Sequence, residues 1–219
     1  MTSSKATPKE EIPKYKLIFL GDQSVGKSCI LNRFMNDAFN EEYQATIGLD
    51  FQSKDALIEG QKIHLLLYDT AGQEKFRSLI PMYTRDANII LFVYDISCRD
   101  SFLHLTDWIK ESSNAKVDEI IFALAGNKND LEDKREISYE EGKKFAEEHN
   151  YIFQEISAKT SDGFSELFNK KLFDKIKTKF NPAGEKPKTE IKNDEQIKIE
   201  KQKGKKKKKV LLNFDFLYI

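Results

Sequence analysis

Short apolar segments alternate with amphipathic segments along most of the chain. Apolar runs of strand length occur at 15–20, 48–58, 62–68, 89–95, 120–125 and 151–156. Segments with helical periodicity lie at 27–36, 101–115, 138–149 and 163–179. Alternation of this kind is typical of a mostly parallel sheet with helices on both faces. The pattern therefore predicts an α/β fold between residues 14 and 180.

The apolar runs are of two kinds. Residues 89–94 and 120–125 are apolar at every position, as expected for central strands that are buried on both faces. The runs at 48–58 and 62–68 contain polar positions and are separated by Glu59-Gly60. This second pair is predicted to be a hairpin that contributes one antiparallel edge strand.

The periodicity stops after Asn181, where the composition changes. Residues 182–209 contain eleven Lys and five Asp or Glu, a net charge of +6, whereas residues 14–181 carry −5. An acidic domain with a basic tail argues against nucleic-acid binding and favours a tail that meets an anionic surface. We expect four parts: a flexible N-terminus at 1–13, a folded domain at 14–180, a disordered Lys-rich tail at 181–209 and a short apolar end at 210–219.

Composition narrows the class of protein further. No apolar run approaches the roughly 20 residues that a membrane-spanning helix needs, and residues 1–13 lack the apolar core of a signal peptide. We therefore expect the chain to remain in the cytosol. The two cysteines, Cys29 and Cys98, exclude a disulfide framework and have no partner at metal-ligand spacing, so we interpret both as small buried apolar residues.

Gly21 to Ser28 (GDQSVGKS) fits the phosphate-loop pattern G-x-x-x-x-G-K-[ST] between a predicted strand and a predicted helix. The glycines allow backbone N–H groups to approach phosphate oxygens, and the helix start adds unpaired donors. Lys27 can reach the β- and γ-phosphates, and the Ser28 hydroxyl can bind Mg²⁺. The alternative, an accidental turn, is disfavoured by the flanking strand and helix. The loop alone does not identify the nucleotide.

A second motif, Asp-Thr-Ala-Gly-Gln at 69–73, follows another predicted strand. Asp69 could hold Mg²⁺ directly or through water. Gly72 would allow the backbone to approach the γ-phosphate, and Gln73 could orient an attacking water. By itself, this stretch could also be only a turn.

A third motif, Asn127-Lys128-Asn129-Asp130, fits N-K-x-D. The Asp130 carboxylate can accept hydrogen bonds from both N1–H and the N2 amino group of guanine, a donor pair that adenine lacks. The stem of Lys128 can lie along the base, and the N–H of Ala158, after the next strand, could donate to O6. The motifs all follow predicted strands, where an open α/β sheet gathers its ligand.

Taken together, these motifs resemble a small GTPase of the Ras superfamily over about residues 14–178. Segments similar to signatures of the Rab branch lie at 47–51, 75–79, 83–87 and 92–97, and segments similar to the Golgi-associated Rab-six subgroup lie at 19–28, 43–48 and 77–81. The resemblance implies the small G-domain version of the phosphate-loop NTPase fold. Its sheet would have six mostly parallel strands with one antiparallel edge strand, and helices on both faces.

The resemblance also assigns roles to residues. The implied nucleotide-binding set is Ser24, Val25, Gly26, Lys27, Ser28, Cys29, Phe39, Tyr43, Thr46, Gly72, Asn127, Lys128, Asp130, Ser157, Ala158 and Lys159. The implied Mg²⁺ ligands are Ser28, Thr46 and Asp69, and the implied catalytic residues are Gln73 and Lys27. Phe39 would stack on guanine, although it could also be a partly exposed apolar loop residue.

The same resemblance places switches at 37–47 and 70–85, ordered by the γ-phosphate and Mg²⁺. An effector surface would comprise Ile47 and the aromatic triad Phe51, Tyr68 and Tyr83. Tyr68 stands where most Rabs have Trp, and it could instead only pack at a strand end. Gln23 occupies a phosphate-loop position that is often glycine, which predicts slow intrinsic hydrolysis, on the order of 10⁻⁴ s⁻¹, with an activating protein supplying an arginine. His64, His104 and His149 receive no role, and Trp108 is interpreted as a packing residue.

The implied function is a monomeric switch that hydrolyses GTP, with GTP/GDP and Mg²⁺ as cofactors. It would regulate vesicle traffic at the Golgi, either within the Golgi or from the Golgi back to the endoplasmic reticulum. Its partners would be an exchange factor, a GTPase-activating protein, GTP-state effectors such as coiled-coil tethers or motor adaptors, and a membrane surface. Two alternatives are a metabolic phosphotransferase and a non-cycling nucleotide-binding scaffold. The guanine motif and the lack of a second-substrate lid argue against the first, and Thr46 with Gln73 argues against the second.

The C-terminal end departs from the Rab pattern of one or two prenylated cysteines, because no cysteine follows Cys98. One interpretation is a reading-frame error near the lysine run at 205–209, which we favour. The other is a genuine tail that binds membrane through lysines and aromatic residues, with residues 210–219 at the interface.

Overall fold

A computed structural model describes residues 12–40, 46, 49–58, 61–70, 78–112 and 119–180. The chain divides into two compact units, Met1–Thr189 and Glu190–Ile219, and the described residues belong to the first. Within these residues, every helix is too short or too polar to cross a membrane.

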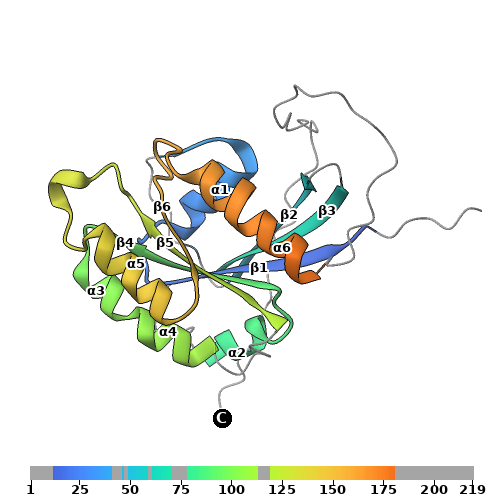
Figure 1. The fold of residues 1–219 in the computed structure, drawn as a ribbon, viewed down its shortest axis with the longest axis horizontal. Helices are drawn as coiled ribbons and strands as arrows, with labels where there is room; N and C mark the ends of the chain where they lie inside the picture. The colour runs from blue at the N-terminus through green and yellow to red at the C-terminus, as the bar shows by residue number, and fades with distance from the viewer. Residues whose placement is uncertain are drawn as a thin grey trace, which may run out of the picture. The chain divides into compact units, whose positions relative to one another are not determined.

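Six strands form one sheet in the order β2-β3-β1-β4-β5-β6 (Figure 1). Their bounds are β1 (Lys14–Leu20), β2 (Leu49–Ile58), β3 (Gln61–Thr70), β4 (Ile89–Asp95), β5 (Ile121–Asn127) and β6 (Ile152–Glu155). The edge strand β2 pairs antiparallel with β3, with Ile58 opposite Gln61, and the other pairs are parallel. Two residues can join antiparallel strands, whereas parallel strands need a longer crossover. The predicted mostly parallel sheet with one antiparallel edge strand is confirmed.

Helices connect the strands and cover both faces of the sheet (Figure 1). Their bounds are α1 (Lys27–Asn36), α2 (Ile80–Thr84), α3 (Arg99–Leu103), α4 (Leu105–Ser112), a 3₁₀ turn η3 (Glu132–Lys134), α5 (Tyr139–Glu148), a π-helical segment η4 (Ser165–Leu172) and α6 (Phe173–Phe180). The helix expected at 101–115 is divided at His104 into α3 and α4. The short helix α2 was not predicted, because five residues are too few for an apolar period to show.

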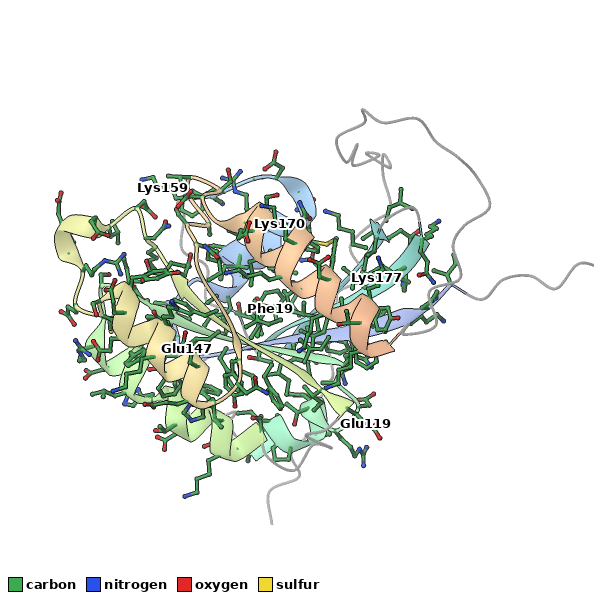
Figure 2. The ribbon with its side chains drawn as sticks, viewed as in Figure 1. Phe19, Glu119, Glu147, Lys159, Lys170 and Lys177 are labelled. Atoms are coloured by element: carbon green, nitrogen blue, oxygen red, sulfur yellow. The ribbon has the colours of Figure 1, made fainter. Side chains whose placement is uncertain are left out.

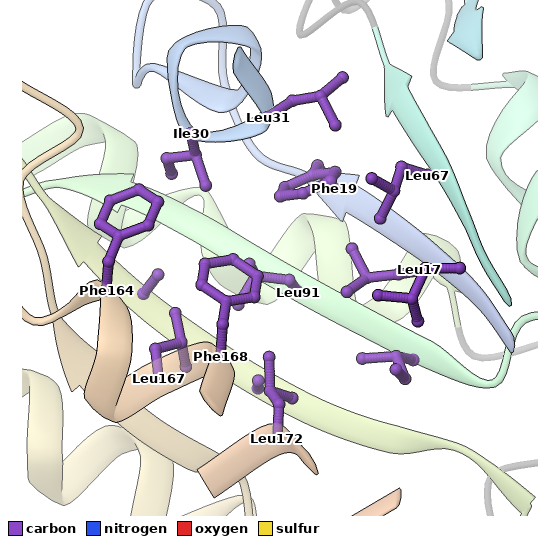
Figure 3. Close-up of a cluster of buried hydrophobic side chains, with 14 of the residues drawn as sticks. Leu17, Phe19, Ile30, Leu31, Leu67, Leu91, Phe164, Leu167, Phe168 and Leu172 are labelled. Carbon is purple, nitrogen blue, oxygen red and sulfur yellow. The ribbon is translucent and has the colours of Figure 1, made fainter. Parts of the chain in front are cut away.

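Successive residues of the central strands point to opposite faces and enter two separate core clusters. Leu17 and Phe19 of β1 pack against α1 and η4, as Figure 3 shows, while Ile18 and Leu20 face α2, α3, α4 and α5. All seven residues of β4 are buried, and its first six alternate between the two clusters in the same way. The prediction that fully apolar runs are central strands buried on both faces is therefore confirmed. Charged side chains such as Glu147 and Lys177 lie at the periphery, and Phe19 lies inside (Figure 2).

The two cysteines differ from expectation. Cys98 is exposed and Cys29 is only partly buried, packed against the core. The prediction that both are buried was wrong for Cys98, because this residue lies in the loop that caps the start of α3 rather than on a strand. Trp108 is a packing residue as expected, with 1% of its surface exposed.

Candidate nucleotide and metal site

The phosphate loop requires glycine at two positions. A Cβ on Gly21 would lie 2.1 Å from the carbonyl oxygen of Val93, and a Cβ on Gly26 would lie 2.3 Å from Nδ2 of Asn127. Both glycines also have positive φ, at 148° and 99° respectively. Any side chain would therefore push the loop away from β4 and β5.

The loop ends at the start of α1. The N–H of Ile30 donates to the carbonyl of Gly26 at 2.8 Å, and the first turn contains no acidic residue and no side-chain cap. The N–H groups of Lys27, Ser28 and Cys29 precede the first donor of the helical ladder, so they have no intrahelical acceptor. These donors and the helix dipole make the end of the loop, with Ser24 and Val25 beside it, an anion site.

Lys27 supplies the cation of this site. Its side chain is buried, with 5% of the residue exposed, and its ammonium donates to the carbonyls of Gly21 at 2.8 Å and Asp22 at 2.7 Å. Burial lowers the pKa of Lys27 to about 8, and the charges of Asp69 and Asp22 oppose this shift. A phosphate in the loop would give this buried cation its counter-charge.

Three predicted metal ligands converge beside Lys27. The Ser28 hydroxyl lies 2.6 Å from the Thr46 hydroxyl and donates to Oδ2 of Asp69 at 2.5 Å, and Thr46 donates to the same oxygen at 3.2 Å. The other oxygen, Oδ1, is buried and has no hydrogen-bond partner in the described part of the chain. Burial raises the pKa of Asp69, against the hydrogen bonds from Ser28 and Thr46.

This donor set fits Mg²⁺. Two hydroxyls and a carboxylate are hard oxygen donors, and Mg²⁺ completes its six ligands with phosphate oxygens and water. The ion would satisfy Oδ1 of Asp69 and favour the charged carboxylate that burial disfavours. In the described ranges, no group of three or more His, Cys, Asp or Glu could hold a metal ion, and this site has only one residue of these types, Asp69.

Asn127, at the end of β5, joins the guanine motif to the phosphate loop. Its Nδ2 donates to the carbonyl of Val25 at 2.8 Å, and its Oδ1 accepts from the N–H of Ala158 at 3.2 Å. The residue is 1% exposed, so both bonds are shielded from water. One side chain therefore connects β5, the phosphate loop and the loop after β6.

Asp130 is exposed, and its carboxylate is oriented by Ser157. The Ser157 hydroxyl donates to Oδ1 of Asp130 at 2.6 Å and accepts from the N–H groups of Lys159 at 3.1 Å and Thr160 at 3.0 Å. The loop after β6 is thus built around one hydroxyl. A carboxylate held in this way can accept two hydrogen bonds from guanine.

Lys128 has a positive φ of 66°, and its ammonium pairs with Oδ2 of Asp95 at 2.5 Å. Asp95 ends β4 and also accepts the N–H of Ser97 at 2.9 Å. The ion pair fixes the outer end of the Lys128 side chain. Asp95 had no place in the sequence-based site.

The aromatic residues of the expected effector surface lie partly together. Phe51 is 46% exposed, and its ring centroid is 5.1 Å from that of Tyr68, which faces it across the β2–β3 pair. The Lys16 ammonium lies 4.6 Å from the Tyr68 ring centroid. Tyr68 and Tyr83 are partly buried and pack against the same core cluster. Packing at a strand end and presentation to a partner are both compatible with this placement.

The structure does not place every expected site residue beside the nucleotide site. Tyr43, Ile47, Gly72 and Gln73 lie outside the described residues, so their roles remain predictions. Phe39 is partly buried and packs against the core cluster on the α1 side of the sheet.

Besides Asp95, sequence reasoning missed the supporting contacts of three other side chains. Arg33 of α1 donates to the carbonyls of Ala158 and Lys159. Trp108 and His104 both contact the carboxylate of Asp22. No local pattern marks these residues, because their partners are separated from them by 82 to 126 positions along the chain.

Residues 16–178 match the family model described as "Ras: Ras family". The match covers well over half of the chain and includes every nucleotide, metal and effector residue named above.

Proposed function

The chain belongs to the Ras family of small GTPases, and we propose that within this family it is a Rab-type switch that regulates vesicle traffic at the Golgi. Membership brings the general properties of the family: GTP and GDP binding with Mg²⁺, GTP hydrolysis, and interaction with exchange factors, activating proteins and effectors. The proposal adds the branch, the membrane and the traffic step, which would lie within the Golgi or between the Golgi and the endoplasmic reticulum.

The observation that carries the switch function is the convergence of Ser28, Thr46 and Asp69. Thr46 belongs to the expected first switch, and its hydroxyl lies 2.6 Å from Ser28 at the start of α1. A metal ion bound here would connect that switch to the phosphates. When the γ-phosphate leaves, this connection weakens and the switch can relax.

Hydrolysis by this site would depend on positioning and charge. Lys27 and the first N–H groups of α1 would hold the phosphate oxygens, and bound Mg²⁺ would supply charge neutralisation on the β- and γ-oxygens. Gln73 would orient the attacking water. Gln23, exposed in the phosphate loop, would crowd that water or Gln73 and slow intrinsic hydrolysis, so that an activating protein would supply an arginine.

The Rab assignment rests on the segments at 47–51, 75–79, 83–87 and 92–97, and on the aromatic contact between Phe51 and Tyr68. Phe51 is the exposed member of this pair and would be the anchor for an effector. Effectors of the GTP state would be coiled-coil tethers or motor adaptors. The protein would act as a cytosolic monomer that associates peripherally with Golgi membranes.

Nucleotide binding is tested with the purified full chain and Mg²⁺. We expect tight binding of GDP and GTP, weak binding of ADP and ATP, and release of GDP by excess EDTA. A phosphotransfer assay with nucleoside monophosphates covers the metabolic alternative, and transfer of phosphate to such an acceptor would refute the switch.

The switch and the traffic role need a second experiment. The full chain is loaded with GDP or a non-hydrolysable GTP analogue and used to capture Golgi coiled-coil proteins, with Phe51→Ala as the matched variant. Capture by the GTP-analogue form alone, lost in Phe51→Ala, is expected. Equal capture in both nucleotide states would instead favour a non-cycling scaffold.

A further inference from the structure

We propose that Arg33 of α1 is a positioning residue for guanine recognition, because it holds the backbone of Ala158 and Lys159 against the helix that begins at the phosphate loop. This inference rests on the proposed function. It concerns a residue outside the nucleotide-binding set derived from the sequence.

The guanidinium of Arg33 makes a forked set of contacts with backbone oxygens. Nε donates to the carbonyl of Ala158 at 2.9 Å, and one terminal nitrogen donates to the carbonyl of Lys159 at 2.8 Å. The other terminal nitrogen donates to the carbonyl of Asp37 at 3.0 Å, at the C-terminal end of α1. The Arg33 side chain is 14% exposed, and its bond to Ala158 is partly buried, whereas the bonds to Lys159 and Asp37 lie at the surface.

These contacts fix the peptide group between Ala158 and Lys159 from both sides. Arg33 holds its carbonyl oxygen, and the Ser157 hydroxyl holds its N–H at 3.1 Å. The preceding N–H, that of Ala158, donates to Oδ1 of Asn127 at 3.2 Å, and it is also the group that the family resemblance assigns to guanine O6, which would share this donor with Asn127. The neighbouring peptide, anchored by Arg33 and Ser157, sets the direction of this N–H. That direction matters because a hydrogen bond weakens steeply when its angle departs from the favoured range.

Arg33 also connects the two ends of the nucleotide site. Lys27 and Ser28 lie in the first turn of α1, at the phosphates, and Arg33 lies in the last turn of the same helix. Lys159, labelled in Figure 2, belongs to the loop at the carboxyl end of β6. One helix therefore positions both the phosphate donors and the loop that meets the base.

The planar fork is what makes arginine suited to this place. A guanidinium offers five N–H donors in fixed directions, whereas the ammonium of lysine is a point donor on a flexible stem. Lysine at position 33 could reach one of the two loop carbonyls but could not hold both in a fixed direction.

The experiment measures the dissociation constants of GDP, IDP and ADP for the full chain and for Arg33→Gln, in the presence of Mg²⁺. GDP and IDP both have the O6 acceptor, ADP lacks it, and IDP lacks only the N2 amino group that meets Asp130. For Arg33→Gln we expect GDP and IDP to bind about ten-fold more weakly, with ADP unchanged. The ratio of ADP to GDP dissociation constants then falls about ten-fold, and the ratio of IDP to GDP stays constant.

Two further variants sharpen the result. Arg33→Lys should give an intermediate loss for GDP. Arg99→Gln is the matched control, because the Arg99 side chain donates to Glu141 and to the carbonyl of Glu136, neither of which belongs to the candidate site. All three dissociation constants should be unchanged in this variant.

Equal weakening of GDP, IDP and ADP in Arg33→Gln would mean a general loss of structure and would overturn the inference, as would unchanged affinity for all three. If the unmodified chain itself fails to prefer GDP over ADP, the proposed function fails. If it prefers GDP and Arg33→Gln retains the full preference, only the role of Arg33 fails.

Discussion

The indole Nε1 of Trp108 donates a hydrogen bond to Oδ1 of Asp22 at 2.7 Å, which joins α4 to the phosphate loop. The other carboxylate oxygen of Asp22 lies 2.6 Å from Nδ1 of His104, at the end of α3. Trp108 is 1% exposed and the Asp22 side chain 21%, so the bond between them is partly buried. The phosphate loop is thus held by side chains from α3 and α4 as well as by its own glycine geometry.

Replacing Trp108 with Phe should destabilise the protein and loosen the loop. The change keeps most of the buried ring but removes the donor to a charged acceptor, an interaction of about 1.5–3 kcal/mol. We expect the free energy of unfolding in urea to fall by about that amount and GDP to dissociate faster. His104→Gln is the comparison, and because His104 is exposed its effect should stay below about 1 kcal/mol. Equal effects of the two changes would contradict this account.

Nucleotide binding should take up a proton at alkaline pH. Burial lowers the pKa of Lys27 to about 8 from the usual 10.5, so between these values the unfolded chain binds more protons than the folded one. Without nucleotide, stability should therefore rise with pH across this window. Phosphates beside Lys27 favour its protonated form, so binding of GDP should take up protons at pH 9 and fewer at pH 7.5. Calorimetry in buffers of different ionisation enthalpy measures this uptake, and a pH-independent value would exclude Lys27 as its source.

Shortening the side chain at position 23 should increase intrinsic GTP hydrolysis. Gln23 is exposed in the phosphate loop, where a long side chain can crowd the attacking water or Gln73. We expect Gln23→Gly to hydrolyse GTP at least several-fold faster than the parent, whose rate should be on the order of 10⁻⁴ s⁻¹. Single-turnover release of phosphate gives both rates. A variant no faster than the parent would remove the proposed role of Gln23.

Truncation of two phenylalanines should lower stability to very different extents. Phe92 of β4 is fully buried, so Phe92→Ala should lower the free energy of unfolding by about 3–5 kcal/mol. Phe51 is 46% exposed and its main aromatic contact is Tyr68, so Phe51→Ala should cost less than about 1.5 kcal/mol and leave GDP affinity unchanged. Thermal melts and GDP titrations of both variants test this pair. A large loss of stability in Phe51→Ala would show that Phe51 serves the fold rather than a partner surface.

The sheet could be predicted from the sequence because each strand corresponds to a local run of apolar residues. The fully apolar run at 89–94 has no polar position, and this alone indicates burial on both faces, as β4 shows. Exposure of Cys98 could not be predicted in the same way. A cysteine is small and apolar by composition, and only the course of the chain decides whether it lies in a core or in a loop.

In the candidate site, too, the residues that lie in local motifs could be predicted and the others could not. Gly21, Lys27, Ser28 and Asp130 were found because their chemistry lies in short motifs, and each motif follows a strand whose end reaches one edge of the sheet. The structure brings Ser28, Thr46 and Asp69 to hydrogen-bonding distance, although Thr46 was placed in the site by the family resemblance and not by one of these motifs.

The sequence by itself determined the α/β fold, the family resemblance and the three motifs that make up the candidate nucleotide site, because local spacing encodes strands, helix starts and phosphate loops. Only the tertiary structure decided which side chains hold those residues in place. Arg33 meets Ala158 across 125 positions, and Trp108 meets Asp22 across 86. Such pairs depend on how helices pack against the sheet, and packing brings together side chains whose separation along the chain follows no period.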